Sequence, residues 1–167
     1  MIGGNERRWA LEVDDPERRQ RLELSVAAYD QGYQYERELT SRNASTYNRI
    51  NRLTSRVLLD ADVLRRPGGD PDVLAELAVA ESILVEQVAS ERMGDPWGYA
   101  DLGLVRLLRG LSASEAYREL DRMRPQRFVY ESALATLRPL ARAAGSLLPE
   151  IEAAVRYLEL AARAARD

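Results

Sequence analysis

The residues that start and stop helices are the sequence feature that most limits what this chain can fold into. Three Asp-Pro dipeptides recur along it, at Asp15-Pro16, Asp70-Pro71 and Asp95-Pro96. In each, the aspartate can accept hydrogen bonds from first-turn amides, and the proline suits the first position of a helix. Gly110 and Gly145 stand where two helices are expected to stop, and Ser112 with Glu115 has capping-box spacing. These marks predict seven helices, at 16–38, 44–65, 71–93, 96–109, 113–124, 127–143 and 148–166.

The apolar residues inside these segments repeat with helical spacing. One face of segment 16–38 carries Leu22, Val26, Tyr29 and Tyr33, and one face of segment 71–93 carries Leu74, Leu77, Ala78, Leu84, Val85 and Val88. Strand signals are nearly absent, because β-branched residues are sparse and no long alternating run occurs. We therefore expect an all-α fold. Glu81 interrupts the apolar face of segment 71–93, so we expect it either to form a buried pair with an arginine such as Arg52 or Arg56 or to contact a ligand.

The connections between these segments are short, so successive helices should be antiparallel neighbours, in a closed bundle or as stacked hairpins. A test for repeats favours stacking. With Trp97 at the aromatic position of a tetratricopeptide-type unit, the remaining signature positions fall on Ala113, Tyr117, Leu120 and Pro125. We therefore expect one helical-repeat domain over 1–167, an α-solenoid of tetratricopeptide-like hairpins, with 1–15 as a candidate N-terminal extension. Its concave side is expected at 44–65, 96–109 and 127–143.

The missing residue types exclude much of the chemistry that enzymes use. The chain has no Cys and no His, and all its basic side chains are Arg because Lys is absent too. Thiolate and imidazole metal ligands, disulfides, Cys nucleophiles and Lys Schiff bases are therefore impossible. We expect no cofactor and no metal. An enzyme built only from carboxylates and Arg is the least favoured class.

Charge and hydropathy limit the partners. The formal net charge is −3 and the basic residues are scattered, so no nucleic-acid partner is expected. The sequence has no apolar run of membrane-spanning length and its start lacks a signal-peptide core, so we expect no membrane partner and a cytoplasmic location. The bias toward Ala, Arg, Leu and Asp is typical of GC-rich bacterial coding sequences. The sequence is compatible with a homo-oligomer.

Two segments resemble a known family. The first is Tyr47-x-x-Ile50-Asn51 before an apolar helix, and the second runs from Asp95-Pro96-Trp97-x-x-Ala100-x-Leu102 through Leu107-Leu108 to Gly110. In this order they are similar to the tetratricopeptide-like TRAF-binding, or central regulatory, region of apoptosis signal-regulating kinases and to the related bacterial TPR-S modules. The resemblance covers about residues 20–143. It implies a non-enzymatic scaffold or sensor linked to an effector. The family usually carries an acidic residue where this chain has Leu104.

Five residues are candidates for binding a partner or ligand, namely Asn48, Asn51, Arg52, Trp97 and Asp101. On a helical wheel Arg49, Arg52 and Arg56 lie opposite the apolar face of 44–65, which predicts a solvated face. The alternative is that Asn48, Asn51 and Arg52 hold an anionic ligand or a peptide. Asn51 lies at the edge of the core, where we expect its amide to bond a backbone carbonyl or an amide of a neighbouring helix.

The aromatic residues divide between core and surface. Trp97 is expected to anchor the core between hairpins, with a ligand platform as the alternative. We expect Tyr29 and Tyr33 in the core and Tyr35 at the surface. The favoured role is a regulatory interaction or sensor module of a bacterial signalling or conflict system, which binds a protein partner through its concave surface. The alternative is a sensor of a small, anionic, nucleotide-derived ligand that controls a linked effector.

Overall fold

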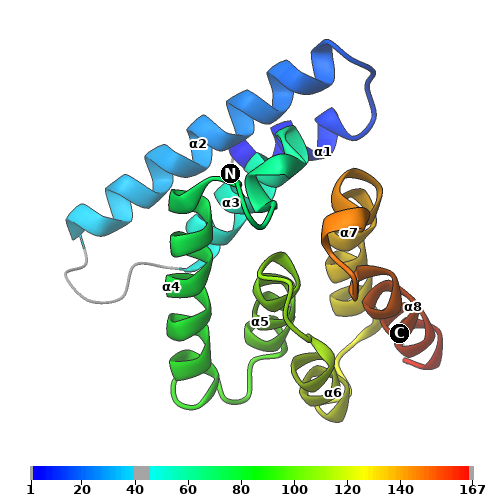
Figure 1. The fold of residues 1–167 in the computed structure, drawn as a ribbon. Helices are drawn as coiled ribbons and strands as arrows, with labels where there is room; N and C mark the ends of the chain where they lie inside the picture. The colour runs from blue at the N-terminus through cyan, green and yellow to red at the C-terminus, as the bar shows by residue number, and fades with distance from the viewer. Residues whose placement is uncertain (1, 40–45, 166–167) are drawn as a thin grey trace. The chain divides into compact units, whose positions relative to one another are not determined.

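The computed structural model describes residues 2–39 and 46–165, and these residues form an all-helical fold without a β-strand. Figure 1 shows the elements in chain order, which are α1 (Ile2–Ala10), α2 (Glu17–Leu39), α3 (Thr46–Leu59), the 3₁₀-helix η1 (Ala61–Leu64), α4 (Pro71–Val88), α5 (Pro96–Leu108), α6 (Ser114–Arg122), α7 (Arg127–Ala144), the 3₁₀-helix η2 (Gly145–Leu147) and α8 (Ile151–Ala164). A helix is present in each of the seven expected segments, which confirms the all-α prediction. The predicted helix start at 44 and end at 166 lie outside the described residues.

Helix α1 was not among the predicted helices, because 1–15 reads only as a candidate extension. The adjacent Gly3 and Gly4 have low helix propensity, which hides this helix from a sequence pattern. The structure shows why glycines stand here. A Cβ built on Gly3 would lie 2.9 Å from Cδ2 of Tyr29, and one on Gly4 would lie 3.2 Å from the Tyr29 hydroxyl oxygen. The two glycines therefore let α1 approach the Tyr29 side chain closely.

Two of the three Asp-Pro dipeptides cap helices in the predicted way. Asp70 Oδ1 accepts hydrogen bonds from the amides of Asp72 at 2.9 Å and Val73 at 3.2 Å. These bonds, led by the one from Val73, lower the pKa of Asp70. Asp95 Oδ1 accepts from the amide of Trp97 at 3.0 Å. Both signals were therefore interpreted correctly.

Gly110 ends α5 as predicted. Its φ of 70° is the left-handed conformation that glycine adopts without strain. The Gly110 amide donates to the Leu107 carbonyl at 2.8 Å, and the Leu111 amide donates to the Arg106 carbonyl at 2.8 Å. This pair of bonds is a Schellman motif, which satisfies the last carbonyls of the helix.

The chain forms two compact units, an N-terminal unit (Met1–Val73) and a C-terminal unit (Leu74–Asp167). In the N-terminal unit α2 packs against both α1 and α3. Its core includes Leu22, Tyr29, Tyr33, Ile50, Leu53 and Val57. The predicted burial of Tyr29 and Tyr33 is confirmed, and Tyr35 is 63% exposed as expected.

Polar groups are also buried in the core of the N-terminal unit. The Ser25 hydroxyl donates to the carbonyl of Gly3 at 2.9 Å and lies 3.0 Å from the Ser55 hydroxyl. Ser25 and Ser55 are fully buried. Hydrogen bonds of side chains on α2 to α1 and α3 therefore help to hold the three helices together.

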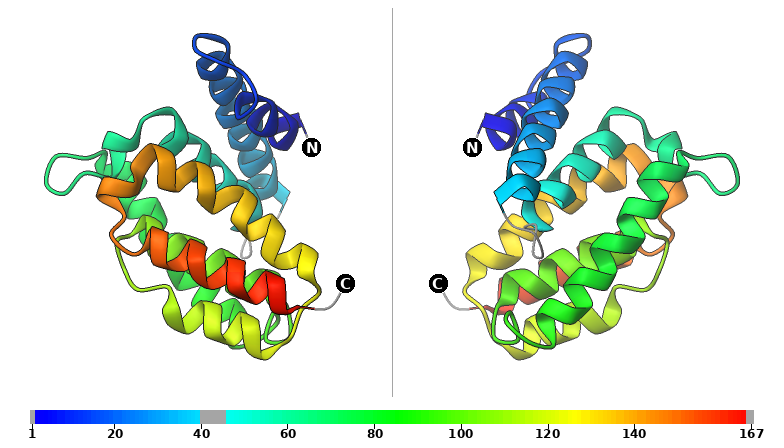
Figure 2. Two further views of the ribbon diagram at one scale, coloured as in Figure 1. Left: turned by 90° about the vertical axis from the view of Figure 1, so that its right-hand side faces the viewer. Right: turned by 90° about the vertical axis from the view of Figure 1, so that its left-hand side faces the viewer.

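In the C-terminal unit α5 packs against α6 and α7, and α8 packs against α6 and α7. Figure 2 shows α8, in red, running alongside α7. Buried leucines fill this unit, among them Leu77, Leu84, Leu107, Leu108, Leu120, Leu137, Leu140 and Leu158. One prediction for α4 is wrong, because Val85 is 44% exposed rather than part of the apolar face.

In the α5–α6 hairpin, Gly103 lies directly against the aromatic ring of Tyr117. A Cβ on Gly103 would lie 2.4 Å from Cε1 of Tyr117, so only glycine leaves room for this contact. Ala113, Tyr117 and Leu120, which the repeat test places at signature positions, are all buried. The two helices can therefore lie close together along this seam.

Candidate functional site

Asn48 and Asn51 both contact neighbouring helices within the N-terminal unit. The Asn48 amide donates to Glu36 Oε1 at 2.6 Å, and Gly32 leaves the space that this side chain occupies. The Asn51 Nδ2 donates to the carbonyl of Tyr47 at 2.8 Å, which is a backbone carbonyl as predicted but one of its own helix. The Asn51 Oδ1 accepts from Arg7 Nη1 at 2.7 Å. Both asparagines therefore connect helices of this unit.

Arg52 is buried, so the predicted solvated face of arginines is wrong at this position. Its Nη1 lies 2.6 Å from Asp30 Oδ1, and its guanidinium lies 5.1 Å from the ring centroid of Tyr33. Arg49 donates to the Tyr33 hydroxyl and lies 5.0 Å from the same ring centroid. A helical wheel places these arginines opposite the apolar face, but α2 covers that side with an acid and an aromatic ring.

Arg56 also has a partner rather than a free solvated position. Its Nη2 lies 2.6 Å from Asp70 Oδ2, the same carboxylate that caps α4. The side chains of both residues are about 30% exposed. This pair joins the end of α3 to the residue before α4.

Trp97 lies at the surface of the C-terminal unit, so the expectation of a core anchor is wrong. Its side chain, in the first turn of α5, is 37% exposed and contacts Phe128 in the first turn of α7, which is 53% exposed. The ring centroids are 5.9 Å apart with the planes tilted by 53°. Such offset contacts between aromatic rings are favourable. The two helices therefore present one aromatic pair to solvent.

Asp101 follows Trp97 by one helical turn, and Arg92 holds its carboxylate. Arg92 Nη1 and Nη2 both lie 3.3 Å from Asp101 Oδ2, while its Nε lies 2.6 Å from Asp95 Oδ2. Burial raises the pKa of Asp101 to about 6, although Arg92 opposes the rise. Burial also raises the pKa of Tyr117, and the Asp101 charge adds to that rise.

Glu81, the acid inside the apolar face of α4, pairs with Arg106 of α5 and with Arg109, the residue directly after α5. Arg106 Nε lies 3.1 Å from Glu81 Oε1, and Arg109 donates to Glu81 Oε2. The predicted ion pair of Glu81 with an arginine is present, but Arg52 and Arg56, which were suggested as examples of the partner, do not form it. Each of those arginines has its own aspartate.

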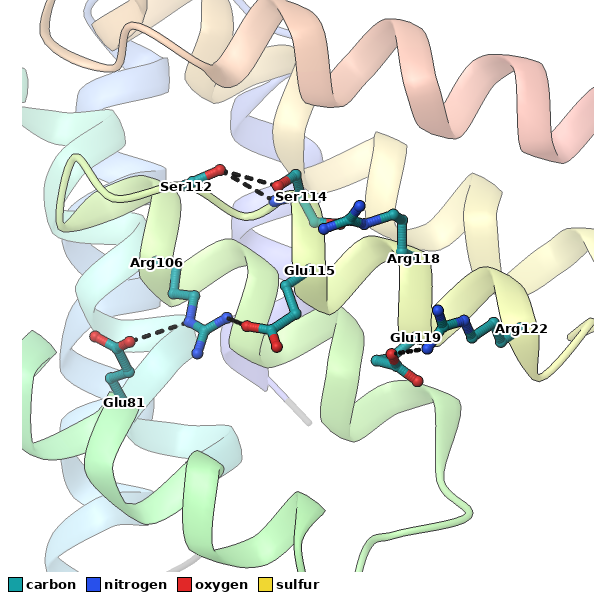
Figure 3. Close-up of polar contacts among 8 residues, drawn as sticks. All are labelled: Glu81, Arg106, Ser112, Ser114, Glu115, Arg118, Glu119 and Arg122. Carbon is teal, nitrogen blue, oxygen red and sulfur yellow. Dashed lines mark hydrogen bonds and ion pairs between the residues drawn. The ribbon is translucent and has the colours of Figure 1, made fainter.

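Figure 3 shows Arg106 between Glu81 of α4 and Glu115 of α6. Arg106 Nη1 lies 3.1 Å from Glu115 Oε2. The predicted capping box of Ser112 and Glu115 is therefore wrong, because the glutamate reaches toward α5 instead of its own helix start. Arg106 joins three helices of the C-terminal unit.

No protein-family model, no curated protein and no solved structure matches this chain. The site must therefore be judged from its own geometry.

The five sequence candidates fall into two groups. Asn48, Asn51 and Arg52 lie on α3 of the N-terminal unit, and Trp97 and Asp101 lie on α5 of the C-terminal unit. The first three contact other side chains of their own unit. Of the five, only Trp97 has a large apolar side chain, and this side chain is exposed.

Two of the hollows in the described part of the C-terminal unit lie away from α5. One of about 280 Å³ lies between α6 and α8, lined by residues that include Ala113, Tyr117 and Tyr157. The other, of about 470 Å³, is lined by residues that include Asp121, Arg124 and Tyr130. Neither of these two hollows is lined by any of the five candidates.

Within residues 2–39 and 46–165, the structure has no group of three or more Asp or Glu side chains that could hold a metal ion. None of the helices in the described ranges is long and apolar enough to cross a membrane.

Sequence reasoning missed two residues that the structure makes prominent. Phe128 completes the exposed aromatic pair, and its place directly after a predicted helix start was the only signal for it. Arg7 bonds Asn51 from α1, a helix that was not predicted. No sequence pattern points to Arg7, because its partner lies 44 residues away.

Proposed function

We propose that this chain is a non-enzymatic interaction module of a bacterial signalling or conflict system, which binds a protein partner through the surface of the C-terminal unit around Trp97 and Phe128. The observation that carries the proposal is the aromatic pair itself. Two large rings from different helices contact each other while both stay substantially exposed.

Aromatic side chains are enriched at protein interfaces and dominate binding energy there. A solvent-exposed ring adds little to the stability of a free protein, since part of its apolar area stays in contact with water. A partner that covers Trp97 and Phe128 removes the remaining area from water. The surface near these rings also carries the Arg92–Asp101 ion pair, which supplies the polar rim that an interface needs.

For the arrangement of the helices, we propose that the chain stacks tetratricopeptide-like hairpins as one repeat domain. The close contact of Gly103 with Tyr117 in the α5–α6 hairpin supports this proposal. In that arrangement α5 and α7 belong to the concave side, and they are the two helices that carry the aromatic pair.

The test is cross-linking of the tagged full chain in its native host, followed by quantitative mass spectrometry. The double variant Trp97→Ala/Phe128→Ala should recover the partner at least about tenfold less well than the wild type, as expected for interface hot spots. The matched control is Leu160→Ala, which removes an exposed apolar side chain from α8 of the same unit.

The partner must then bind the purified wild type directly, with affinity that the double variant loses and Leu160→Ala keeps. Equal recovery with the wild type and the double variant would end the proposal. So would a double variant whose binding defect follows from unfolding, which circular dichroism detects.

The alternative function, sensing a small anionic ligand, is favoured by an observation in the N-terminal unit. It concerns Arg7 and Asn51 rather than the set of Asn48, Asn51 and Arg52.

A further inference from the structure

Arg7 is a cation that is largely withdrawn from water without an acid beside it. Among the described residues no carboxylate pairs with Arg7, and the one hydrogen bond of its guanidinium runs from Nη1 to Asn51 Oδ1. Burial lowers the pKa of Arg7, and the charge of neighbouring Arg8 lowers it further, while Tyr29 and Tyr47 raise it. An arginine stays protonated under these conditions, so the local charge is positive and unbalanced.

The acid nearest in sequence does not balance this charge. Glu6 pairs with Arg21, whose Nη1 lies 3.0 Å from Glu6 Oε2. Arg8 bonds the side chain of Asn5 at 2.6 Å. The polar side chains of α1 on either side of Arg7 therefore have partners elsewhere, and Arg7 keeps unused N–H donors.

A second donor lies in the same cluster. The Tyr29 hydroxyl is buried, and no atom of the described chain meets hydrogen-bond geometry with it. Burial raises the pKa of Tyr29 to about 12; Arg7 opposes the rise, and both the charge and the nearby hydroxyl of Tyr47 add to it. The phenol is therefore a neutral O–H group that can donate to a ligand. The ring of Tyr47 meets that of Tyr29 edge-on, with centroids 6.1 Å apart.

Asn51 orients the guanidinium. Its Nδ2 donates to the carbonyl of Tyr47 at 2.8 Å, which leaves its Oδ1 to accept from Arg7. This second bond fixes one edge of the planar fork and leaves the other nitrogens for a ligand. Asn51 is then a positioning residue for Arg7.

We propose that Arg7 and Tyr29 form a binding site for a small oxyanion, a carboxylate or a phosphate group, in the N-terminal unit. The cluster offers two kinds of donor, a guanidinium fork and a phenol, and no carboxylate in the described part of the chain pairs with its guanidinium. A guanidinium matches the paired oxygens of carboxylate and phosphate, and such charge-assisted bonds are the strong ones. This site goes beyond the proposed partner surface and does not depend on it.

The competing interpretation is that Arg7 only sets the register between α1 and α3. The two interpretations differ in anion-free solution. A buried cation without an acid is costly, so replacing it by a neutral residue should leave the fold equally stable or more stable if the site serves a ligand. If Arg7 is only a structural connector, the same replacement should destabilise the fold at every anion concentration.

The experiment compares wild type, Arg7→Gln and the control Arg8→Gln, the adjacent arginine of α1 whose side chain is exposed. Melting temperature is measured against sodium phosphate and, separately, sodium acetate, with sodium chloride holding the ionic strength constant. We expect at least one of the two oxyanions to raise the melting temperature of the wild type and of Arg8→Gln saturably, as ligand linkage requires. Arg7→Gln should bind at least about tenfold more weakly, the loss expected for a hydrogen bond to a charged group.

A local readout follows anion binding in the wild type itself, independently of the stability of Arg7→Gln. In ¹H–¹⁵N spectra of the arginine Nε–Hε groups, the signal of Arg7 should shift with the same saturation curve as the melting temperature. Tyr29→Phe, which removes only the hydroxyl, should weaken binding by several-fold.

Whether phosphate or acetate raises the melting temperature identifies the class of oxyanion that binds. A saturable rise with either anion supports the site. The absence of a saturable effect for both anions would overturn it. An equal effect in wild type and Arg7→Gln, or an Arg7 signal that stays fixed, would do the same. Trp97→Ala/Phe128→Ala should keep the full anion response, so failure of the partner surface and failure of this site give different results.

Discussion

The two units hold their helices together with different chemistry. In the N-terminal unit, buried or part-buried polar side chains help to join the helices, as in Ser25 with Ser55 and Asp30 with Arg52. In the C-terminal unit, Gly103 against Tyr117 represents a seam of small and apolar residues, and the ion pairs of Arg106 lie at its edge. Polar side chains between helices favour one helix arrangement because each must reach its hydrogen-bond or charge partner. Apolar side chains favour one arrangement because their shapes must fit together.

The largest effect is expected from changing the shape of the apolar seam. Gly103→Ala places a methyl group 2.4 Å from the Tyr117 ring, so the ring or the helix must move. We expect a loss of about 2–3 kcal/mol in the free energy of unfolding, toward the upper end for overpacked cores. Denaturant unfolding measures it.

The control for this change is Gly145→Ala. Its Cβ meets no atom within 4 Å and its φ of −56° suits alanine, so stability should be unchanged or rise slightly. If Gly103→Ala behaves like this control, the close approach of α5 and α6 is not set by Gly103.

A second test concerns Asp101, the acid of the C-terminal unit whose pKa burial raises to about 6. An unfolded aspartate titrates near about 3.9. Between these values the folded chain binds more protons than the unfolded chain, so this group lowers the free energy of unfolding as pH rises from about 4 to about 6. Asp101→Asn lacks this pH-dependent contribution to the free energy of unfolding.

Across that window the stability of Asp101→Asn relative to wild type should increase by about 1–2 kcal/mol, less than the full shift implies because the carboxyl is partly solvated. Chemical unfolding at a series of pH values measures the difference, in which the titration of other groups cancels. A constant difference from pH 4 to 7 would show that Asp101 titrates as an ordinary surface acid.

Local signals explain how much of the fold could be predicted from the sequence. Asp70, Asp95 and Gly110 act through bonds to residues at most five positions away, so their meaning could be predicted without knowing the fold. Helix α1 escaped prediction because its two glycines are favourable only against the Tyr29 ring. That contact exists only after the chain folds.

The candidate site was less predictable, because its polar residues bind partners that are distant in the sequence. Arg52 was expected in water, but Asp30 and Tyr33 of α2 cover it. Glu81 was recognised as an acid that needs an arginine, yet nothing local distinguishes Arg106 from Arg52. Trp97 was singled out for the correct reason, a large ring at a helix start, but whether such a ring is buried depends on the neighbouring helices.

The polar seam of the N-terminal unit can be tested at Asp30, whose partner Arg52 is buried. Asp30→Asn removes the charge and keeps the shape, so we expect a loss of about 1 kcal/mol in the free energy of unfolding. Glu23→Gln on the same helix is the control. Its pair with Arg19 is exposed on both sides, so its loss should be at most about 0.5 kcal/mol. Equal losses would mean that the seam does not depend on this ion pair.

The smallest effects are expected from the exposed aromatic residues, where the two units differ again. Trp9 in the N-terminal unit is 50% exposed and lies under its own cation, with the Arg21 guanidinium 3.9 Å from the ring centroid. Phe128 in the C-terminal unit meets Trp97 instead. Trp9→Ala and Phe128→Ala should each cost less than about 1 kcal/mol, the lower part of the range for exposed cation–π and aromatic pairs.

The two variants should differ in binding, not in stability. If the aromatic pair is kept for a partner, Phe128→Ala lowers partner recovery while Trp9→Ala leaves it unchanged, although both lose one exposed ring. Thermal unfolding of the isolated variants beside the cross-linking assay separates the two effects. A large stability loss in Phe128→Ala, at the level of a buried phenylalanine, about 3–5 kcal/mol, would show that the pair closes the C-terminal unit. Its exposure would then be no argument for a partner.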